Sequence, residues 1–420
     1  MSLSELVLLY LYNTELYYWI LLGMIIVGGI VIKKNHISII DPFFMAIISC
    51  ICAYTIPFFL YKTGYCSVRN FWYFTLSESV FWISFFSFKK TTKFKKIVFI
   101  KEKECARILF YISLVVYLYA TIYTYTHIGI PLFMRSRLEL YENTGLGFLG
   151  RFTDFASFYL CYYTFHEIIT MRKKKYILVL GVIAINLFLS GSKGAILILL
   201  TTFFVYYWFY LGKKARIKWK YILLVIPFPI LVLMMQAETE ELPVSDALSL
   251  LGIRLMAYGD VYLYAYPNDI IDQVKILHPF YSFLKPLLAP LRLMTTEATD
   301  NAIGLQLFWT VNPSYTGMNQ GPNARMAIMG WCYFKWLGIL FSAFCGWLLA
   351  FILYRGRKYF PHSFLGICIY GYLYNFSFSI ITDFSLFLGS LATLVINLLF
   401  YGVIVLLLLN FKIRYRLQRI

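Results

Sequence analysis

Long apolar runs separated by short polar connections are the feature that most limits what this chain can fold into. A helix needs about 20 apolar residues to cross the hydrocarbon core of a bilayer. Runs close to that length cover residues 16–32, 43–61, 71–88, 108–127, 152–170, 176–190, 195–211, 221–235, 328–354, 363–381 and 385–409. Because 60% of the residues are hydrophobic and only 14% are charged, the apolar surface exceeds what a water-soluble domain can bury. The sequence therefore predicts an all-α membrane protein with about eleven transmembrane helices.

The lysines and arginines indicate how these helices are oriented. Most of the 38 basic residues lie in six blocks between apolar runs: Lys33 with Lys34, Lys89 to Arg107, Arg172 to Lys175, Lys213 to Lys220, Arg355 to Lys358, and Lys412 to Arg419. With alternating crossings all six blocks fall on one side, and cytoplasmic loops collect Lys and Arg. The N-terminus is therefore predicted outside and the C-terminus inside. The net charge of +18 is explained by these topology signals, so no nucleic-acid partner is predicted.

Three regions follow from this arrangement. Residues 1–235 form a membrane region with eight spans, residues 236–327 form a large extracytoplasmic loop, here called the long loop, and residues 328–420 form a membrane region with three spans. The long loop has no counterpart in the first half of the chain. Many transporters are built from repeats, so this asymmetry counts against a transporter.

Cysteines and histidines give no sign of a metal or disulfide framework. Most of the eight cysteines fall inside apolar runs as small core residues, and Cys66 alone lies in an outward-facing loop. No His, Cys or carboxylate spacing typical of a metal site occurs. We therefore predict no metal and no cofactor, and the N-terminal residues do not resemble a removable signal peptide.

The turn Ser190-Gly191-Ser192-Lys193-Gly194 is a first candidate for binding chemistry. The preceding run, 176–190, is short for a span, so the turn is expected to lie below the outer membrane surface. Backbone N–H groups at a helix start, together with Lys193, suit a phosphate. A tight hairpin with a snorkelling lysine explains the same residues, and both interpretations stay open.

A second candidate lies in the predicted outer connection between residues 128 and 151. Arg135, Arg137 and Arg151 suit phosphate and sugar hydroxyls because the guanidinium fork donates in a plane. Glu139 and Glu142 are near enough to pair with Arg135 and Arg137 as ordinary surface charges, so this interpretation also stays open.

The long loop carries the largest set of candidates. Residues 246–266 show apolar residues at helical spacing around Arg254 and Asp260, which predicts an amphipathic helix and either a structural ion pair or a substrate-facing pair. Residues 280–294, interrupted by Pro286 and Pro290, predict short pieces lying on the membrane surface with Arg292 at their end. His278 is a further candidate in this loop.

The end of the long loop predicts an anion site. Pro322 suits the first position of the ninth helix, which would place Arg325 in the first turn. A cation there is opposed by the helix dipole, and makes sense when an anion is held by the arginine and the free N–H groups. By contrast Lys62, Arg69 and Lys335 are interpreted as snorkelling anchors at helix ends.

The entry into the ninth run carries a recognisable set of residues: Gly321, Pro322, Asn323, Gly330, Trp331, Tyr333, Phe334, Leu337 and Gly338. Together with the turn at 190–194, the late loop and the extracytoplasmic arginines, this entry resembles the Wzy-type O-antigen and oligosaccharide repeat-unit polymerases of bacteria. The resemblance implies a GT-C-like fold and a metal-independent glycosyltransferase in the inner membrane. It would use undecaprenyl-diphosphate-linked oligosaccharides as donor and acceptor on the periplasmic face, together with a chain-length regulator protein in the same membrane.

The resemblance also suggests roles for single residues. The diphosphate would be met by Arg254, Arg325, Arg292, Lys193, Arg135, Arg137 and Arg151, which would stabilise the departing charge. Asp260 or His278 would act as the base that takes the acceptor proton. Aromatic and amide side chains suit a carbohydrate groove, and Tyr315, Asn319, Asn323 and Trp309 are the candidates.

Two other functions fit the same kind of chain. An O-antigen ligase would use the same donor but transfer to the lipid A core; such ligases resemble one another in a His followed by Gly, and His278 has no such glycine. A flippase for lipid-linked oligosaccharides would move the substrate without chemistry, and the chain lacks the repeated halves common in transporters.

Overall fold

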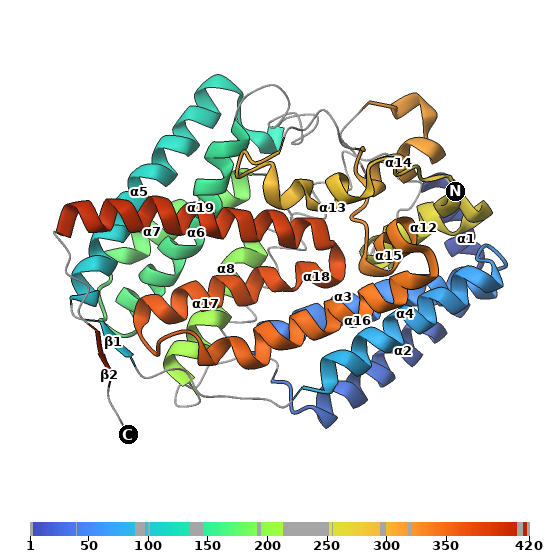
Figure 1. Ribbon diagram of the computed structural model, residues 1–420, viewed down its shortest axis with the longest axis horizontal. Helices are drawn as coiled ribbons and strands as arrows, with labels where there is room; N and C mark the ends of the chain where they lie inside the picture. The colour runs from blue at the N-terminus through green and yellow to red at the C-terminus, as the bar shows by residue number, and fades with distance from the viewer. Residues whose placement is uncertain are drawn as a thin grey trace. The chain divides into compact units, whose positions relative to one another are not determined.

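The computed structural model is built almost entirely of helices (Figure 1). It describes residues 3–38, 40–88, 97–99, 101–133, 146–190, 195–212, 252–253, 255–294, 300–317, 321–409 and 415–417. Two three-residue strands, β1 (Ile97–Phe99) and β2 (Tyr415–Leu417), pair antiparallel with Ile97 opposite Leu417. The chain divides into two compact units. The first unit holds Met1–Lys90, Pro243–Arg355 and Phe376–Ser390, and the second unit holds Thr91–Leu242, Gly356–Asn375 and Leu391–Ile420.

The first unit combines membrane helices with the described part of the long loop. Its helices are α1 (Leu3–Tyr12), α2 (Thr14–Lys34), α3 (Pro42–Lys62), α4 (Val68–Phe86), α15 (Met326–Phe334), η8 (Lys335–Leu337), α16 (Gly338–Ala350), η9 (Phe351–Arg355) and α18 (Ser379–Thr382). Helices α4 and α16 lie side by side (Figure 1). The hydroxyl oxygens of Ser77 and Ser342 are 2.5 Å apart, and a Cβ on Gly346 would lie 2.2 Å from the carbonyl oxygen of Phe81. Small residues therefore let these two helices approach closely, as is common in membranes.

The described part of the long loop contributes six short elements to the first unit. They are η5 (Ala257–Gly259), α12 (Asp260–Ala265), η6 (Pro267–Gln273), α13 (Pro279–Leu288), α14 (Ile303–Val311) and η7 (Pro313–Tyr315). A Cβ on Gly259 would lie 2.7 Å from the carbonyl oxygen of Ala53 in α3. The loop is therefore packed directly against a membrane helix at this glycine.

Hydrogen bonds made by tyrosine hydroxyls join helices in the second unit. Its elements are α5 (Glu102–His127), η1 (Pro131–Phe133), α6 (Leu146–Ile169), α7 (Tyr176–Leu189), α8 (Ala195–Val205), η3 (Tyr206–Leu211) and η10 (Gly356–Lys358), while α17 (Phe364–Ser377) and α19 (Phe384–Leu409) have residues in both units. The Asn186 amide in α7 donates to the Tyr117 hydroxyl in α5 at 2.6 Å. The Tyr159 hydroxyl in α6 donates to the Ala106 carbonyl at 2.7 Å. Such bonds join helices where lipid offers no partner.

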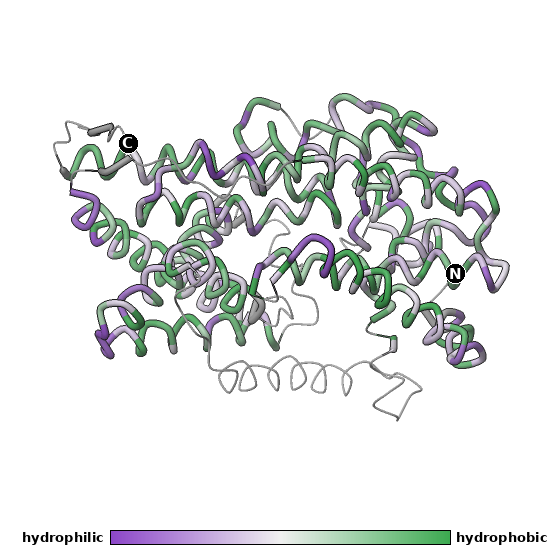
Figure 2. Tube along the Cα trace, turned by 90° about the horizontal axis from the view of Figure 1, so that it is seen from below, coloured by the Kyte–Doolittle hydropathy of each residue, from purple (hydrophilic) through white to green (hydrophobic). Residues whose placement is uncertain are grey.

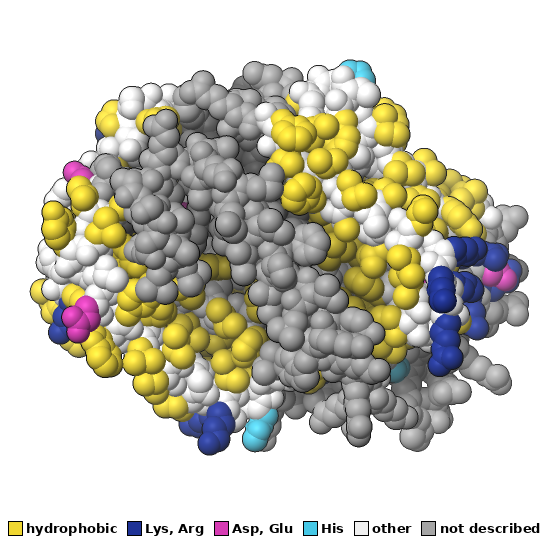
Figure 3. All heavy atoms as spheres, turned by 180° about the vertical axis from the view of Figure 1, so that it is seen from behind, with side chains coloured by type: hydrophobic (Ala, Val, Ile, Leu, Met, Phe, Trp, Pro, Cys, Tyr) yellow, Lys and Arg dark blue, Asp and Glu magenta, His cyan; other side chains and the backbone are white. Residues whose placement is uncertain are grey.

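Length and composition make this a multi-pass membrane protein. Six helical stretches in the described residues are long and apolar enough to cross a membrane: Thr14–Lys34, Pro42–Lys62, Glu102–Phe133, Met326–Lys358, Phe364–Thr382 and Phe384–Leu408. Long hydrophobic stretches alternate with hydrophilic ones along the trace (Figure 2). Hydrophobic side chains also cover much of the described surface in Figure 3. An all-α membrane protein, as the sequence predicts, is thereby confirmed.

The predicted spans agree with the described helices in position. Helical elements cover each predicted run except 221–235, which lies outside the described residues, and the run 328–354 is divided at Lys335 into several of them. Some of these helices, such as the 14-residue α7, are too short to count among the six long apolar stretches. The number of eleven crossings therefore stays a prediction.

Two predictions about prolines need correction. Pro286 lies inside α13, so the expected break there is wrong, whereas the helix does end at Leu288, ahead of Pro290. The ninth helix begins at Met326 and not at Pro322. A close contact accounts for this: a Cβ on Gly304 would lie 1.8 Å from the Pro322 carbonyl oxygen, so residues 321–325 run as a non-helical segment against α14.

All eight cysteines are free thiols, and seven of them are buried. Cys66, expected in an outward-facing loop, has a side chain only 5% exposed. Cys332 is the one with intermediate exposure.

Candidate functional site

An open groove lies in the described part of the long loop. Its volume is about 520 Å³, and it is lined by Lys275, Leu277, Asp300, Asn301, Gln306, Trp309 and Thr310. We call it the loop groove. Trp309 and Thr310 belong to α14, and the remaining residues belong to the connections on either side of α13 and to the start of α14.

Asp300 fixes one wall of the loop groove. Its carboxylate accepts hydrogen bonds from the backbone N–H groups of Leu277 at 3.0 Å and His278 at 2.9 Å, and from the Ser282 hydroxyl at 2.8 Å. Slight burial acts to raise the pKa of Asp300, but these donors outweigh it and hold the pKa below its usual value. Asp300 is therefore an ionised structural group whose oxygens are already engaged.

Gln306 fixes the other wall. Its amide oxygen accepts from the Lys275 N–H at 3.0 Å, and its amide nitrogen donates to the carbonyls of Lys275 and Asn301 at 3.0 and 2.9 Å. These bonds hold the backbone, while Lys275, Asn301 and Trp309 contribute to the lining. An aromatic ring beside a cation and an amide suits a polar ligand that has both flat faces and hydroxyl groups.

Arg325 occupies a second, fully buried position in the same unit. It is the N-cap residue of α15 and only 2% exposed. Its guanidinium donates to the Tyr258 carbonyl at 3.3 Å and to the Cys50 sulfur at 3.7 Å. The guanidinium carbon lies 5.6 Å from the ring centroid of Tyr54. The structure therefore gives this arginine protein partners from α3 and η5, and its predicted role as a diphosphate ligand stays a prediction.

Glu78 is a second charged residue buried near Arg325. It lies on α4, is 6% exposed, and accepts a hydrogen bond from the Tyr54 hydroxyl. The Tyr54 hydroxyl in turn accepts from the Trp82 indole N–H at 3.2 Å. Tyr54 contacts both charged groups, because its hydroxyl donates to Glu78 and its ring lies beside the guanidinium of Arg325.

Asp260 is another carboxylate near Arg325, at the start of α12. Its carboxylate accepts from the Val261 N–H at 2.8 Å. Burial raises the pKa of Asp260 to about 6, although the Val261 N–H and the charge of Arg325 act to lower it. The structure thus brings Asp260 and Arg325 together, as two residues that the sequence analysis singled out separately.

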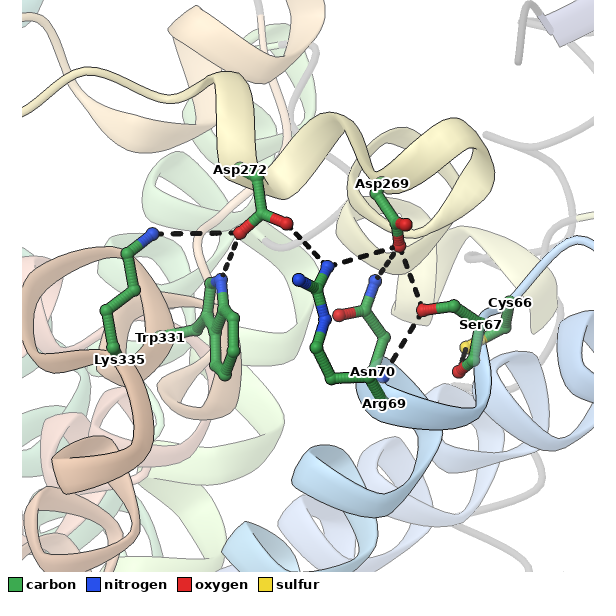
Figure 4. Close-up of polar contacts among 8 residues, drawn as sticks. All are labelled: Cys66, Ser67, Arg69, Asn70, Asp269, Asp272, Trp331 and Lys335. Carbon is green, nitrogen blue, oxygen red and sulfur yellow. Dashed lines mark hydrogen bonds and ion pairs between the residues drawn. The ribbon is translucent and has the colours of Figure 1, made fainter.

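Asp272 centres a third polar group, shown in Figure 4. Its carboxylate accepts from Arg69 at 2.5 Å and from the Trp331 indole N–H at 2.8 Å, and it lies 3.7 Å from the Lys335 ammonium. Both cations also face the Trp331 ring, at 5.2 and 5.4 Å from its centroid. Arg69 and Lys335, interpreted from the sequence as snorkelling anchors, each pair with this carboxylate while their side chains stay partly exposed.

Asp269 extends the Asp272 cluster toward the start of α4. It accepts from the Ser67 hydroxyl at 2.9 Å and the Asn70 amide at 2.8 Å, and lies 3.4 Å from Arg69 (Figure 4). Asn268 and Asp269 both have positive φ angles, of 55° and 52°. A positive φ is strained at these two non-glycine residues. The hydrogen bonds of Asp269 hold the backbone of η6 in this conformation.

The other predicted residues of the long loop lie in the first unit outside these groups. His278 is the exposed N-cap of α13, and Arg292 is exposed just beyond that helix. Tyr315 packs edge-to-face on Phe308, and Asn323 is exposed ahead of α15. His278 reaches the loop groove through its backbone bond to Asp300, whereas Tyr315 and Asn323 do not line the groove.

Arg151 belongs to the second unit, where it joins α6 to α19. It donates to the Thr393 hydroxyl at 2.9 Å, and its carbonyl accepts from the Asn397 amide at 3.0 Å. Arg254, Lys193, Arg135, Arg137 and Asn319 lie outside the described residues.

The sequence analysis missed Glu78, Tyr54, Asp272 and Gln306. Glu78 had a usable signal, since a single carboxylate inside a predicted span is costly to bury and marks a functional or paired group. Tyr54 and Gln306 had none, because their roles depend on contacts with residues far away in the chain.

Comparisons of the chain with protein-family models, with curated proteins and with solved structures find no match.

Proposed function

We propose that this protein polymerises undecaprenyl-diphosphate-linked oligosaccharide repeat units by glycosyl transfer on the periplasmic face of the bacterial inner membrane. The observation that carries the proposal is the loop groove. A groove of about 520 Å³ with Trp309, Asn301 and Lys275 in its lining suits several sugar rings, and it lies in a multi-pass membrane protein. The product would be O-antigen or a related surface polysaccharide.

The pairing of distant segments supports the proposed topology. The start of α4 and η6 meet in the Asp272 cluster, so the connection 62–70 and the long loop lie together, as expected for two loops on one side. Strands β1 and β2 join two of the basic blocks that the charge pattern places in the cytoplasm. A GT-C-like arrangement of about eleven helices with the loop outside is the architecture we propose.

The proposed reaction is a displacement at the anomeric carbon of the donor. The acceptor hydroxyl oxygen attacks that carbon, the bond from carbon to diphosphate oxygen breaks, and the hydroxyl proton passes to a base. Asp260 and His278 stay the candidates for this base, because Asp260 adjoins Arg325 and His278 adjoins the groove wall. The leaving diphosphate carries the charge that cationic side chains of the long loop would stabilise.

A reconstituted assay tests this function. Purified protein given only the lipid-linked repeat unit should lengthen it without ATP, added metal or lipid A core, because cleavage of the bond between the anomeric carbon and the diphosphate oxygen supplies the driving force. Trp309→Ala should raise the KM for the repeat unit about tenfold, equivalent to roughly 1.4 kcal/mol of lost binding. Trp72→Ala is the matched control, since Trp72 is an exposed tryptophan on α4 outside the groove.

The outcomes of the assay separate the three functions. A requirement for the lipid A core would assign a ligase, and movement of the substrate across vesicles without elongation would assign a flippase. Cells lacking the protein should still attach a single repeat unit to their surface lipid, which a gel shows as one band above the bare core. Loss of that band would contradict the polymerase.

A further inference from the structure

The buried guanidinium of Arg325 needs a counter-ion. Arginine stays protonated under all ordinary conditions, and an isolated buried charge is costly unless it is paired or hydrogen-bonded. The groups around it are the Cys50 thiol, the Tyr54 and Tyr262 hydroxyls, and two carboxylates. Only Glu78 and Asp260 can supply a negative charge among these neighbours.

The geometry favours Glu78 over Asp260. Tyr54 presents its ring to Arg325 and donates its hydroxyl to Glu78, so one side chain couples both charges. The Trp82 indole N–H polarises the same hydroxyl further. The carboxylate of Asp260 is instead held by the N–H of Val261, next to it in the chain. Glu78 is also buried, with 6% of its surface exposed.

Arg325 is connected to the loop groove through a backbone contact. The segment 321–325 ends at this arginine, and within it the Pro322 carbonyl fills the space where Gly304 lacks a side chain. A Cβ on Gly321 would in turn lie 2.6 Å from the Gly304 carbonyl oxygen. Gly304 belongs to α14, the helix that carries Trp309. Holding Arg325 in place therefore holds the helix that forms one side of the groove.

We propose that Glu78 is the buried counter-ion of Arg325, coupled through Tyr54, and that this pair positions α14 and the loop groove. The assignment of the loop groove as a saccharide site rests on the proposed function, but the assignment of the charge pair does not. Glu78 acts in this proposal as a positioning residue, because it reaches the groove only through Arg325 and the segment 321–325.

A double-mutant cycle in the full-length protein tests the pairing. Glu78→Gln or Arg325→Met alone leaves one buried charge without its partner, so each should lower the melting temperature in detergent by more than about 5 °C. The double variant removes both charges and should recover most of that loss. Tyr54→Phe keeps both charges but removes the bridging hydroxyl, and should give a smaller loss.

Asp260 supplies the matched control cycle. A cycle of Asp260→Asn with Arg325→Met should show a much weaker coupling between the two changes in melting temperature, since Asp260 is not the counter-ion in this proposal. Losses that add in the Glu78 cycle, or a stronger recovery in the Asp260 cycle, would overturn it.

Hydrogen exchange tests the positioning role separately from activity. Glu78→Gln should speed amide exchange in residues 303–311 and 321–327 several-fold, while exchange in α5 and α7 of the second unit stays unchanged. The double variant should restore protection in both segments. Unchanged exchange in 303–311, or a rise spread evenly over both units, would refute a positioning role. None of these measurements uses substrate, so a failed elongation assay would leave their outcome intact.

Discussion

Among single residues, Asp260 has a protonation state that affects stability near neutral pH. Burial raises its pKa to about 6 in the folded protein, whereas an aspartate in an unfolded chain titrates near 3.9. The folded state therefore keeps the proton to higher pH, and ionisation lowers the free energy of unfolding as the pH rises from about 4 to about 6. The difference between the folded and unfolded pKa values lowers the free energy of unfolding by roughly 3 kcal/mol, and this loss is complete above about pH 6.

Asp260→Asn should remove this dependence, because the amide cannot ionise. The variant is expected to melt higher than the natural protein at about pH 7.5 and at the same temperature near pH 4. Thermal unfolding in detergent across this range is the measurement. A gap between the two proteins that does not change with pH would show that Asp260 is solvated in the folded state.

The residues also show what the sequence could and could not reveal. Asp260 was found from the sequence because a charge in an apolar surround is expensive, and Arg325 because a cation at a helix start is opposed by the helix dipole. Their arrangement could not be found, since it depends on Tyr54 and Glu78, which follow from α3 and α4 packing beside the loop. The sequence predicts a bound anion beside Arg325 at the start of the ninth helix. Charge balance does not require that anion, because a carboxylate of the protein itself lies near Arg325.

At the level of elements, the Asp272 cluster joins three pieces that are far apart in the chain. Arg69 starts α4, Asp272 ends η6, and Trp331 and Lys335 come from α15 and η8. The charged side chains here are 35 to 55% exposed, so solvent weakens each ion pair. The cluster therefore guides where η6 lies more than it stabilises the whole fold.

Arg69→Ala should loosen η6 at a cost of about 1 kcal/mol or less. Lys62→Ala is the matched control, because Lys62 ends α3 close by and has no ion pair among the described residues. Limited proteolysis within 267–273 should become faster in Arg69→Ala only, and the difference from the natural protein should shrink in about 1 M salt as the charges are screened. Equal cleavage of both variants would mean that the cluster does not hold η6.

Helix positions were predictable where apolar runs are long, and poorly predictable within the long loop. Each predicted run in the described residues is a helix because hydrocarbon leaves the backbone no other partner. Helix starts in the loop depend on contacts between distant residues. The Pro322 carbonyl packs on Gly304, and this contact delays the start of α15 to Met326 despite a proline at a favourable position.

For the whole molecule, membrane embedding follows from composition, whereas the groove does not. The six long apolar helices among the described residues account for multi-pass insertion. Serine, asparagine and tyrosine side chains within the apolar runs form hydrogen bonds between helices. The loop groove depends on Asp300 and Gln306 binding backbone groups about twenty to thirty residues away. No local pattern in the sequence encodes such bonds.

The shielding of the native thiols has a practical consequence for establishing which loops face outward. Because seven of the eight cysteines are buried and none forms a disulfide, a membrane-impermeant maleimide should react slowly with the natural protein in intact cells. A single cysteine introduced at exposed Gln273 should then be labelled rapidly from outside, whereas one at exposed Lys358 should be labelled only after the cells are opened. The reverse pattern would invert the orientation and place the loop groove in the cytoplasm. No cysteine-free background is needed for this experiment.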